Sequence, residues 1–556
     1  MKITKDSAII NVTIFDIGDF NLFVVLKELV KKEVNFGVKI QSKNDIFQEG
    51  KIMKVREETK KLTLISLVLM IFTSVFGFNN IPRSFYLMGY GAIPWYLISG
   101  VTFFIPFAFM LAEYGSAFQK EKGGIYSWMT KSVGPKYAFV GTFMWYASYI
   151  IWMVNVSNGI WIVFSNAIFG KDTTATWSIL GLNSTQTIGA LGVLWIIFVT
   201  FTATKGLDKI KKITSVGGIA VALLNIVLII GAISVFIGSG GHLAQPIVNA
   251  TSFVKSPDPS YGNPIAVLSF LVFALFAYGG IEVVGGLVDQ TKNPNKTFPK
   301  GIIFASVIIA IGYSLGIFVV GIFTNWNQVL SSKSVHMGNV GYVVMNNLGY
   351  QLAHVFGGSQ AFSQSMGAWM ARFVGISMVL ALTGAFFTLT YAPLKQIIEG
   401  TPKELWPGKL AVVEDGMPHN AMWIQCIIVV VMILMVSFGG DAAAQFFNKL
   451  VLMTNVAMTL PYMFIAGAFA SFKKKEEIIK PFEIYKSYRS SLIWTIIVTF
   501  TVGFANFFTI IQPAIQGDLS STLWSIAGPL CFSIVALVMY RSYEIKTKKV
   551  IIATAK

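Results

Sequence analysis

Two clusters in this 556-residue sequence combine helix-breaking residues with polar or charged side chains inside long apolar stretches. The first, residues 74–83, reads Ser-Val-Phe-Gly-Phe-Asn-Asn-Ile-Pro-Arg. Pro82 removes one backbone donor and obstructs the carbonyl of Phe78, and Gly77 lets the chain leave helical geometry at low cost. The two asparagines between them can bond the backbone groups that such a break frees. A simple proline kink is the alternative, although the cluster is denser than a kink requires.

The second cluster, residues 276–289, begins Phe-Ala-Tyr-Gly-Gly-Ile-Glu and continues through a further glycine pair to Asp289. Its adjacent glycines weaken a helix just before the carboxylate of Glu282. If the surrounding apolar stretch crosses a membrane, an ionisable side chain within it is costly and indicates a functional site. A structural pairing that only holds helices together is the alternative.

Two interrupted helices of this kind would perform complementary chemistry. The N-terminus of a half-helix presents unpaired N–H groups and a positive dipole end, which hold an anion such as a carboxylate. The C-terminus of a half-helix and the carbonyls freed by a break hold a cation such as an ammonium group. One break of each kind in a single cavity fits a zwitterion, and the commonest small zwitterion is an amino acid.

The elements that would position these clusters are long apolar segments. The chain is 54% hydrophobic and 12% charged with a mean hydropathy of +0.66, whereas an ordinary globular domain carries roughly 25% charged residues. This composition excludes a soluble globular protein, a disordered protein and a nucleic-acid-binding protein. A segment of about 18 apolar residues can cross a bilayer as a helix that satisfies its own backbone, so we expect an all-α integral membrane protein. Twelve segments qualify, the ninth being the shortest: 62–88, 92–112, 137–165, 185–204, 213–237, 265–288, 302–323, 366–391, 421–437, 446–470, 491–512 and 522–540.

The two clusters fall in the first and sixth of these segments. Interrupted helices five spans apart are typical of transporters built from inverted repeats. We therefore expect a 5+5 inverted repeat with broken helices 1 and 6 and two appended helices. The predicted organisation is a first repeat at 62–237, a second repeat at 265–470, helices 11 and 12 at 491–540, and a basic cytoplasmic tail at 541–556.

Lysine and arginine are distributed unevenly between the loops. If the N-terminal flank is cytoplasmic, the inside segments from Met53 onward hold 29 of these residues and the outside loops hold 3. Positive residues favour the cytoplasmic side, so we expect both termini in the cytoplasm. Most of the net charge of +17 then belongs to this asymmetry, with anionic lipid headgroups as its partner.

Residues 1–52 depart from this pattern, with 8 basic and 7 acidic residues. They are too few for a stable independent domain, and they lack the basic region and uninterrupted apolar core of a signal peptide. Residues 48–53 back-translate to codons that allow a purine-rich ribosome-binding sequence just before an ATG. We therefore expect a native start at Met53, with residues 1–52 untranslated; a small cytoplasmic extension is the alternative.

These motifs resemble the amino acid–polyamine–organocation (APC) superfamily of transporters. Three parts of the sequence carry the resemblance, which extends over about residues 60–545: the break at 77–82, the segment 112–135 with its Lys-Gly-Gly-Ile-Tyr-Ser-Trp sequence, and the second cluster with its downstream loop at 292–300. The chain looks most similar to YjeM-type bacterial inner-membrane permeases and, more distantly, to glutamate/γ-aminobutyrate antiporters. The resemblance implies a LeuT-type fold of twelve transmembrane helices and alternating access.

The resemblance also implies roles for individual residues. Backbone groups of the first break would bind the substrate carboxylate, and those of the second break its amino group. Phe276 would act as an aromatic gate, and Glu282 as a pH-responsive, proton-coupling carboxylate. The implied substrate-binding residues are Gly77, Phe78, Asn79, Asn80, Phe276, Ala277, Gly279 and Gly280. In the third segment, Trp152 and Asn155 are the residues that we expect near the pocket.

Some residues depart from the pattern of the superfamily. Related permeases often begin the first break with Gly-Ser-Gly, whereas this chain has Phe76 before the glycine, and its bulk should alter the pocket. The fifth segment contains no ionisable residue, which leaves Glu282 as the main candidate for protonation. The sequence leaves the roles of Arg83 and Arg372 undecided. Each could neutralise Glu282, bind a side-chain carboxylate of the substrate, or extend to the membrane interface from a helix end.

The function that fits best is secondary transport of amino acids or related zwitterions across the bacterial cytoplasmic membrane, by exchange or proton-linked uptake. A sodium-coupled symporter is the alternative, with the hydroxyls of Thr383, Thr388 and Thr390 as candidate ligands. A membrane enzyme or receptor is disfavoured because the short loops contain neither a hydrolytic triad nor a Walker-type loop. Cys426 and Cys531 stand in separate apolar runs and predict neither a disulfide nor a metal site. The expected partners are an amino-acid substrate, membrane lipids and protons, without cofactor, ATP or nucleic acid.

Overall fold

The structure, a computed structural model, describes residues 61–554, with the backbone alone at 441–455 and 549–554. The expected N-terminal extension and the native start at Met53 lie outside the described residues. Apart from isolated β-bridges, every regular element in the described part of the chain is a helix. The all-α prediction is therefore confirmed.

The α-helices are numbered in chain order. They are α3 (Leu64–Val75), α4 (Asn80–Met88), α5 (Ala92–Ser99), α6 (Ile105–Ala117), α7 (Gly124–Ser132), α8 (Pro135–Phe169), α9 (Ser184–Ala203), α10 (Leu207–Gly238), α11 (Pro264–Ala277), α12 (Pro294–Phe323), α13 (Val340–Val355), α14 (Gln360–Gly400), α15 (His419–Phe438), α16 (Gly440–Lys474), α17 (Tyr488–Ile515) and α18 (Leu519–Thr554). The short helices are η1 (Gly89–Gly91), η2 (Gly100–Phe104), η3 (Thr174–Thr176), η4 (Ala250–Phe253), η5 (Pro259–Tyr261), η6 (Ile281–Leu287), η7 (Trp326–Leu330) and η8 (Lys403–Leu405).

Among the described residues, 11 helical segments are long and apolar enough to cross a membrane, one fewer than the sequence predicts. The difference lies in the first segment, Leu64–Ala117, whose 54 residues combine the first two expected spans. As one straight helix it would be about 80 Å long, far beyond the ~30 Å of a bilayer core. The chain instead turns back at η1, as the 2.8 Å hydrogen bond from Ser84 Oγ to Tyr96 Oη shows. A continuous helix would hold these two residues about 18 Å apart.

Both predicted helix breaks are present. α3 ends at Val75 and α4 begins at Asn80, while α11 ends at Ala277 and is followed by the 3₁₀ helix η6. Gly280 adopts a φ of +106°, a left-handed conformation that residues with a side chain disfavour. A Cβ at this position would lie 2.6 Å from the carbonyl oxygen of Ser74. The glycine therefore lets the second break lie directly against the first.

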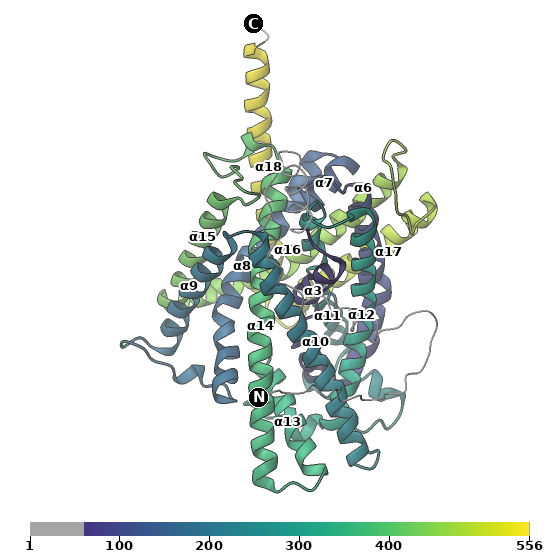
Figure 1. Cartoon of the computed structure of the whole chain (residues 1–556), viewed down its shortest axis with the longest axis vertical. Helices are drawn as coiled ribbons and strands as arrows, with labels where there is room; N and C mark the ends of the chain where they lie inside the picture. Colours follow the sequence, from purple (N-terminus) through teal and green to yellow (C-terminus); the bar gives the residue numbers. More distant parts are fainter. Residues whose placement is uncertain (1–60, 555–556) are drawn as a thin grey trace, which may run out of the picture. The chain divides into compact units, whose positions relative to one another are not determined.

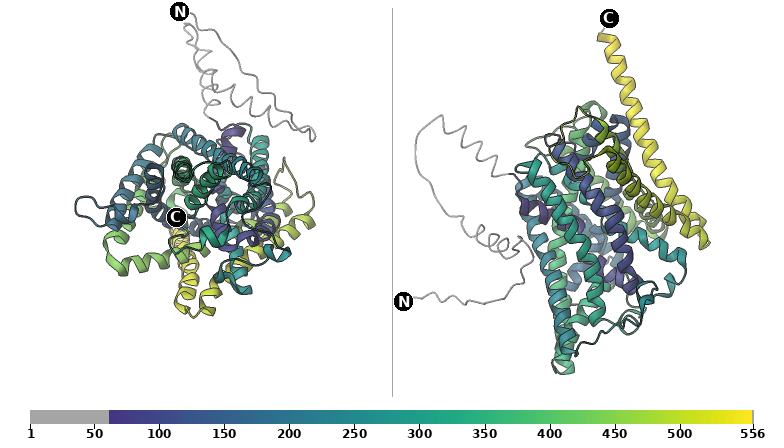
Figure 2. Two further views of the ribbon diagram at one scale, coloured as in Figure 1. Left: turned by 90° about the horizontal axis from the view of Figure 1, so that it is seen from below. Right: turned by 90° about the vertical axis from the view of Figure 1, so that its right-hand side faces the viewer.

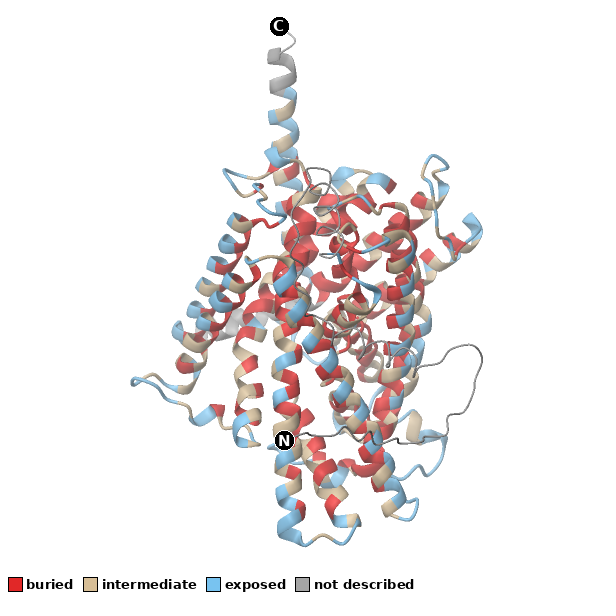
Figure 3. Cartoon of the chain, viewed as in Figure 1, coloured by how far each residue is buried: buried red, intermediate tan, exposed pale blue. Residues whose placement is uncertain are grey.

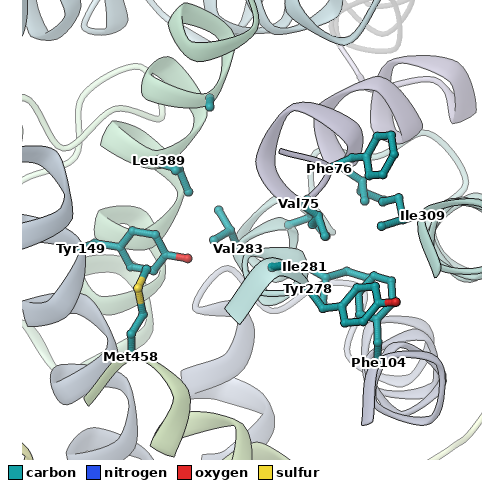
Figure 4. Close-up of a cluster of buried hydrophobic side chains, with 14 of the residues drawn as sticks. Val75, Phe76, Phe104, Tyr149, Tyr278, Ile281, Val283, Ile309, Leu389 and Met458 are labelled. Atoms are coloured by element: carbon teal, nitrogen blue, oxygen red, sulfur yellow. The ribbon is translucent and has the colours of Figure 1, made fainter. Parts of the chain in front are cut away.

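Aromatic packing supports the breaks on one side. α12 packs against α3, α4, α5 and α6, and α14 packs against α8, α10 and α13 (Figure 1). Tyr278 stacks on Phe104 with ring centroids 4.4 Å apart and meets the rings of Tyr96 and Tyr313 edge-on. Figure 4 shows Tyr278 and Phe104 in the buried cluster that also contains Val75. These contacts give the non-helical backbone a rigid apolar support.

Large apolar side chains also cover the outward faces of several spans. Ile230 of α10 is 60% exposed, Phe500 of α17 is 67% exposed and Val538 of α18 is 63% exposed. Figure 3 shows exposed residues along the outer sides of the helices and buried residues between them. Soluble proteins rarely expose large apolar patches, so these faces suit a lipid environment.

Three segments that the sequence suggests to be loops or tail are helical. α7 and α13 lie in expected loops, and α18 continues to Thr554 and extends beyond the other helices (Figure 2). None of the three additions is part of a predicted span. A search for long apolar stretches detects bilayer crossings, and it does not detect helices that lie outside them.

Candidate functional site

A cavity of about 400 Å³ lies between the two breaks and is lined by residues of α3, α4, α8, α11, α13, α14 and α16. This volume is within the range of about 300–1,000 Å³ that small-molecule sites occupy. Seven of the eight predicted substrate-binding residues line the cavity. Phe78 is the exception, because its side chain is 1% exposed and packs into the core. Trp152 and Asn155 line the cavity, as the sequence predicts.

Tyr313 of α12 joins the two breaks through its hydroxyl group. This oxygen accepts hydrogen bonds from the N–H of Gly77 at 3.0 Å and from Asn80 Nδ2 at 3.3 Å. It also lies 3.0 Å from the carbonyl oxygens of Val75 and Ala277, and its single proton is shared between these two acceptors. One side chain thus satisfies backbone groups that both breaks would otherwise leave unpaired.

The bond to Tyr313 changes the role predicted for Gly77, whose N–H is already engaged. The N–H groups of Phe78 and Asn79, which precede the first residue of α4, donate no hydrogen bond to any described residue. They stand where the positive end of the α4 dipole is directed toward the break. The first break therefore keeps two unpaired backbone donors, and that of Asn79 belongs to a residue that lines the cavity.

The second break supplies fewer free acceptors than predicted. The carbonyl of Phe276 accepts from the N–H of Gly279, and the carbonyl of Ala277 accepts from Tyr313. Gly279 lines the cavity, and its own carbonyl accepts no hydrogen bond from the part of the chain that the structure describes. The carbonyl of Gly279 is accordingly the acceptor available for an amino group.

Glu282 is fully buried behind the cavity wall. Its Oε1 atom accepts hydrogen bonds from Trp145 Nε1 at 2.9 Å, from the Tyr149 hydroxyl at 3.1 Å and from the Tyr462 hydroxyl at 3.4 Å. Its Oε2 atom accepts from the N–H of Gly280 at 3.1 Å. Tyr149 and Tyr462 line the cavity, so the carboxylate is connected to it through their hydroxyl groups.

The hypothesis that an arginine neutralises Glu282 is wrong for this conformation. Arg372 donates from Nε and Nη2 to the carbonyls of Ile168 and Phe169, both at 3.3 Å, at the end of α8. Across the described residues, neither Arg83 nor Arg372 forms an ion pair with a carboxylate. Neutral hydrogen-bond donors satisfy the glutamate instead of a cation.

Arg83 lines the cavity, where its Nε donates to the carbonyl of Met337 at 2.7 Å. Three oxygen atoms of other lining residues are buried and have no hydrogen-bond partner in the described part of the chain: Ser74 Oγ, Asn79 Oδ1 and the hydroxyl of Tyr342. Burial raises the pKa of the Tyr342 phenol above its ordinary value, so this hydroxyl stays protonated. Buried polar atoms without partners are uncommon, and these three belong to residues that line the same cavity.

Two phenylalanines flank the breaks in different ways. Phe276, the predicted gate, lines the cavity and is 38% exposed. Phe76 is 4% exposed and packs its ring against Tyr313 with centroids 4.7 Å apart. The expectation that Phe76 alters the pocket is therefore wrong, because its side chain lies against α12 and outside the cavity lining.

Polar contacts close the end of the bundle where η6 meets α14. Lys395, a buried residue of α14, donates to the carbonyl of Gly286 at 2.8 Å and to Asp289 Oδ1 at 2.7 Å. The neighbouring Gln396 Nε2 donates to the carbonyl of Val283 at 3.0 Å. These bonds fix η6 against α14, on the side of the breaks away from α13.

The sequence-based interpretation missed Tyr313, Tyr342 and Lys395. Tyr313 lies in a predicted span without a helix break. The one indication in the sequence was that a buried tyrosine hydroxyl needs a hydrogen-bond partner. Tyr342 lies in a predicted loop. Lys395, just after the eighth predicted span, entered the sequence analysis only as one of the positive charges that set the predicted topology. Their partners are far away in sequence, so no local motif includes them.

Comparisons with known proteins agree with this architecture. A model of the family described as amino acid permease matches residues 62–538. The inner membrane transporter YjeM of Escherichia coli (strain K12) is 56% identical over 486 residues, covering 87% of this chain and 96% of that protein. The aspartate/glutamate permease AcaP of Lactococcus lactis subsp. cremoris is 24% identical over 415 residues, covering 74% and 80% of the two chains. A glutamate/gamma-aminobutyrate antiporter of Lactococcus lactis subsp. lactis is 21% identical over 457 residues, covering 82% and 84%.

Proposed function

This chain belongs to the amino acid permease family, and from that premise we propose that it moves amino acids or related zwitterions across the bacterial inner membrane by alternating access. Its relatives are named as transporters and permeases, so the chain is a membrane transporter and not an enzyme. The transport is secondary, by exchange or by proton-linked uptake.

One observation carries the proposal: a cavity between two helix breaks has free backbone groups of both kinds. The amide of Asn79, with the unpaired amide of Phe78 next to it in the chain, is suited to a substrate carboxylate, and the Gly279 carbonyl to its amino group. Gly77, Asn80, Ala277 and Gly280 then shape the site, and Phe276 acts as its gate. A small zwitterion matches both charges at once.

The chain crosses the membrane twelve times in this proposal, with Leu64–Ala117 contributing two crossings. The first five and next five crossings form the inverted repeats, at 62–237 and 265–470, and the last two are appended. The distribution of positive residues supports cytoplasmic termini and a cytoplasmic η6–α12 connection. The bonds of Lys395 then lie on the cytoplasmic side and support an outward-facing interpretation of this conformation.

Glu282 is the proposed proton-coupling residue. Its four donors belong to α8, α16 and the second break, so its protonation can be sensed by several elements that line the cavity. The sodium-coupled alternative has weaker support. Two of its candidate ligands, Thr383 and Thr388, bond their hydroxyls to carbonyls of their own helix, and Thr390 Oγ1 is 4.0 Å from Met153 Sδ.

Counterflow tests the proposal directly. The purified protein is reconstituted in liposomes preloaded with single unlabelled amino acids, and entry of the same labelled amino acid is followed both with and without sodium. We expect transient accumulation for at least one amino acid, equal with and without sodium. Absence of counterflow for the whole panel would overturn amino-acid transport, and a strict sodium requirement would favour the symporter.

A further inference from the structure

Arg83 brings an uncompensated positive charge to the cavity. Among the described residues that line the cavity, it is the one with a charged side chain, and no described carboxylate pairs with it. Its Nε is bonded to the Met337 carbonyl, while its two Nη nitrogens donate no hydrogen bond within the described chain. A guanidinium offers a planar set of donors that matches a carboxylate with two parallel bonds.

A second donor stands beside this guanidinium. The hydroxyl of Tyr342 is buried and lacks a partner within the described part of the chain, and its side chain is 3% exposed. Arg83, Tyr342 and Asn79 all line this cavity, and the side chains of Arg83 and Asn79 both act on the Tyr342 phenol. Arg83 belongs to α4 and Tyr342 to α13, so two different helices contribute these groups to the cavity lining.

The guanidinium of Arg83 is separated along α4 from the backbone donors of Phe78 and Asn79. The N–H of Arg83 bonds to the carbonyl of Asn79 at 3.1 Å, so the arginine stands one helical turn beyond the break. One turn of α-helix is about 5.4 Å long. Two anion-binding groups thus follow each other along α4, while Glu282 is already saturated by its own four donors.

We propose that the substrate is a dicarboxylic amino acid, such as aspartate or glutamate, and that Arg83 with Tyr342 selects its side-chain carboxylate. The inference rests on the proposed function and names the substrate class of the same site. The α-carboxylate binds the free amides at the start of α4, and the amino group binds the Gly279 carbonyl. The side-chain carboxylate then accepts hydrogen bonds from Arg83 Nη and from the Tyr342 hydroxyl. It gives the guanidinium an anionic partner and the phenol hydroxyl an acceptor.

Competition in the counterflow assay tests this assignment. Aspartate, glutamate, asparagine, glutamine and alanine compete for labelled-substrate entry by the wild type, Arg83→Gln and Tyr342→Phe. The matched control is Arg372→Gln, which removes an arginine bonded to carbonyls at the end of α8. In the wild type, we expect dicarboxylates to inhibit at concentrations at least about tenfold lower than their amides, since a hydrogen bond to a charged group contributes about 1.5–3 kcal/mol.

The variants separate selectivity from general damage. Arg83→Gln should remove the preference for acids over amides by weakening the acids alone, Tyr342→Phe should reduce it, and Arg372→Gln should leave it unchanged. Equal inhibition by acids and amides in the wild type would overturn the dicarboxylate assignment, and this result needs no variant. An equal loss for both classes in a folded Arg83→Gln would also overturn it. Absence of counterflow for every amino acid would instead overturn the proposed function.

Discussion

The carboxylate of Glu282 can bind a proton, and it is hydrogen-bonded to the backbone of the second helix break. In the charged form both oxygens act as acceptors, one for three side-chain donors and the other for the N–H of Gly280. Protonation turns one oxygen into a donor, which conflicts with the donors that already face it. The position of Gly280 and the orientation of Tyr149 and Tyr462 therefore depend on the protonation state, and the two tyrosines line the cavity.

Glu282→Gln removes this dependence. We expect wild-type transport to vary with pH and the variant to transport with a nearly flat pH profile. Substrate binding should persist, because the proposed ligands are backbone atoms and residues other than Glu282. Initial rates of proteoliposome uptake across a pH series measure the effect. Retention of the full wild-type pH profile would contradict the coupling role, and complete loss of binding would make Glu282 a substrate ligand or a structural residue.

Tyr313→Phe removes the hydroxyl shared by both breaks. The N–H of Gly77 would then be unpaired, and an unsatisfied buried donor costs about 1–3 kcal/mol. We expect a lower melting temperature in detergent and at least about tenfold slower transport. Tyr137→Phe is the matched control, since it removes a bond to the carbonyl of Phe464 away from the breaks. Wild-type transport by Tyr313→Phe would mean that the bridging hydroxyl is dispensable.

The helix η6 is held at one end by the break and at the other by α14. Lys395 bonds both the Gly286 carbonyl and Asp289, and its side chain is almost fully buried. In the proposed alternating-access cycle, opening the cavity on this side would require η6 to leave α14, so we expect the ion pair to break in each cycle. We therefore expect the pair to stabilise the conformation in which this side is closed.

Lys395→Met should shift the protein toward the form that is open on the η6 side. Breaking a buried ion pair costs about 3–5 kcal/mol in the closed form, so the closed population should fall strongly. The reporter is Leu389→Cys, at a cavity-lining position, in a protein from which the two native cysteines have been removed. The readout is the rate at which an impermeant thiol reagent labels this cysteine in inside-out vesicles. We expect at least about tenfold faster labelling. Lys122→Met, which removes the 3.7 Å ion pair between the exposed Lys122 and the largely buried Glu399, is the control, and equal labelling in both variants would contradict the closing role.

The distribution of lysine and arginine between the connections predicts how the helix bundle is oriented in the membrane. Basic residues gather in the connections at one end, including the segment between α16 and α17, whereas Lys333 is one of three in the opposite loops. An orientation that reversed this distribution would oppose the membrane insertion preference for positive residues. With the basic connections on the cytoplasmic side, both termini would lie in the cytoplasm.

Reporter fusions test this orientation. Alkaline phosphatase, which is active outside the cytoplasm, should be active when fused after Lys333 and inactive when fused after Lys475. Green fluorescent protein at the C-terminus should fluoresce, because it folds in the cytoplasm. Expression levels measured by immunoblot are the control for both sites. The opposite activity pattern would reverse the proposed topology and place the Lys395 contacts outside the cell.

The sequence by itself determined the membrane environment, the all-α architecture and the position of both helix breaks. These properties are local: apolar length, glycine, proline and a carboxylate act on the segment that contains them. It also identified seven residues that line the cavity, because backbone that leaves a helix inside a membrane must face a cavity or another polar partner.

The tertiary structure decided which of those groups are free to bind a substrate. Gly77 and Tyr313 are 236 residues apart, yet their hydrogen bond removes a predicted carboxylate ligand. Packing likewise gave Glu282 aromatic donors in place of an arginine, and it left Arg83 without a carboxylate. A hydrogen bond depends on the distance and direction between two groups, and for residues on different helices only the packing of those helices sets both.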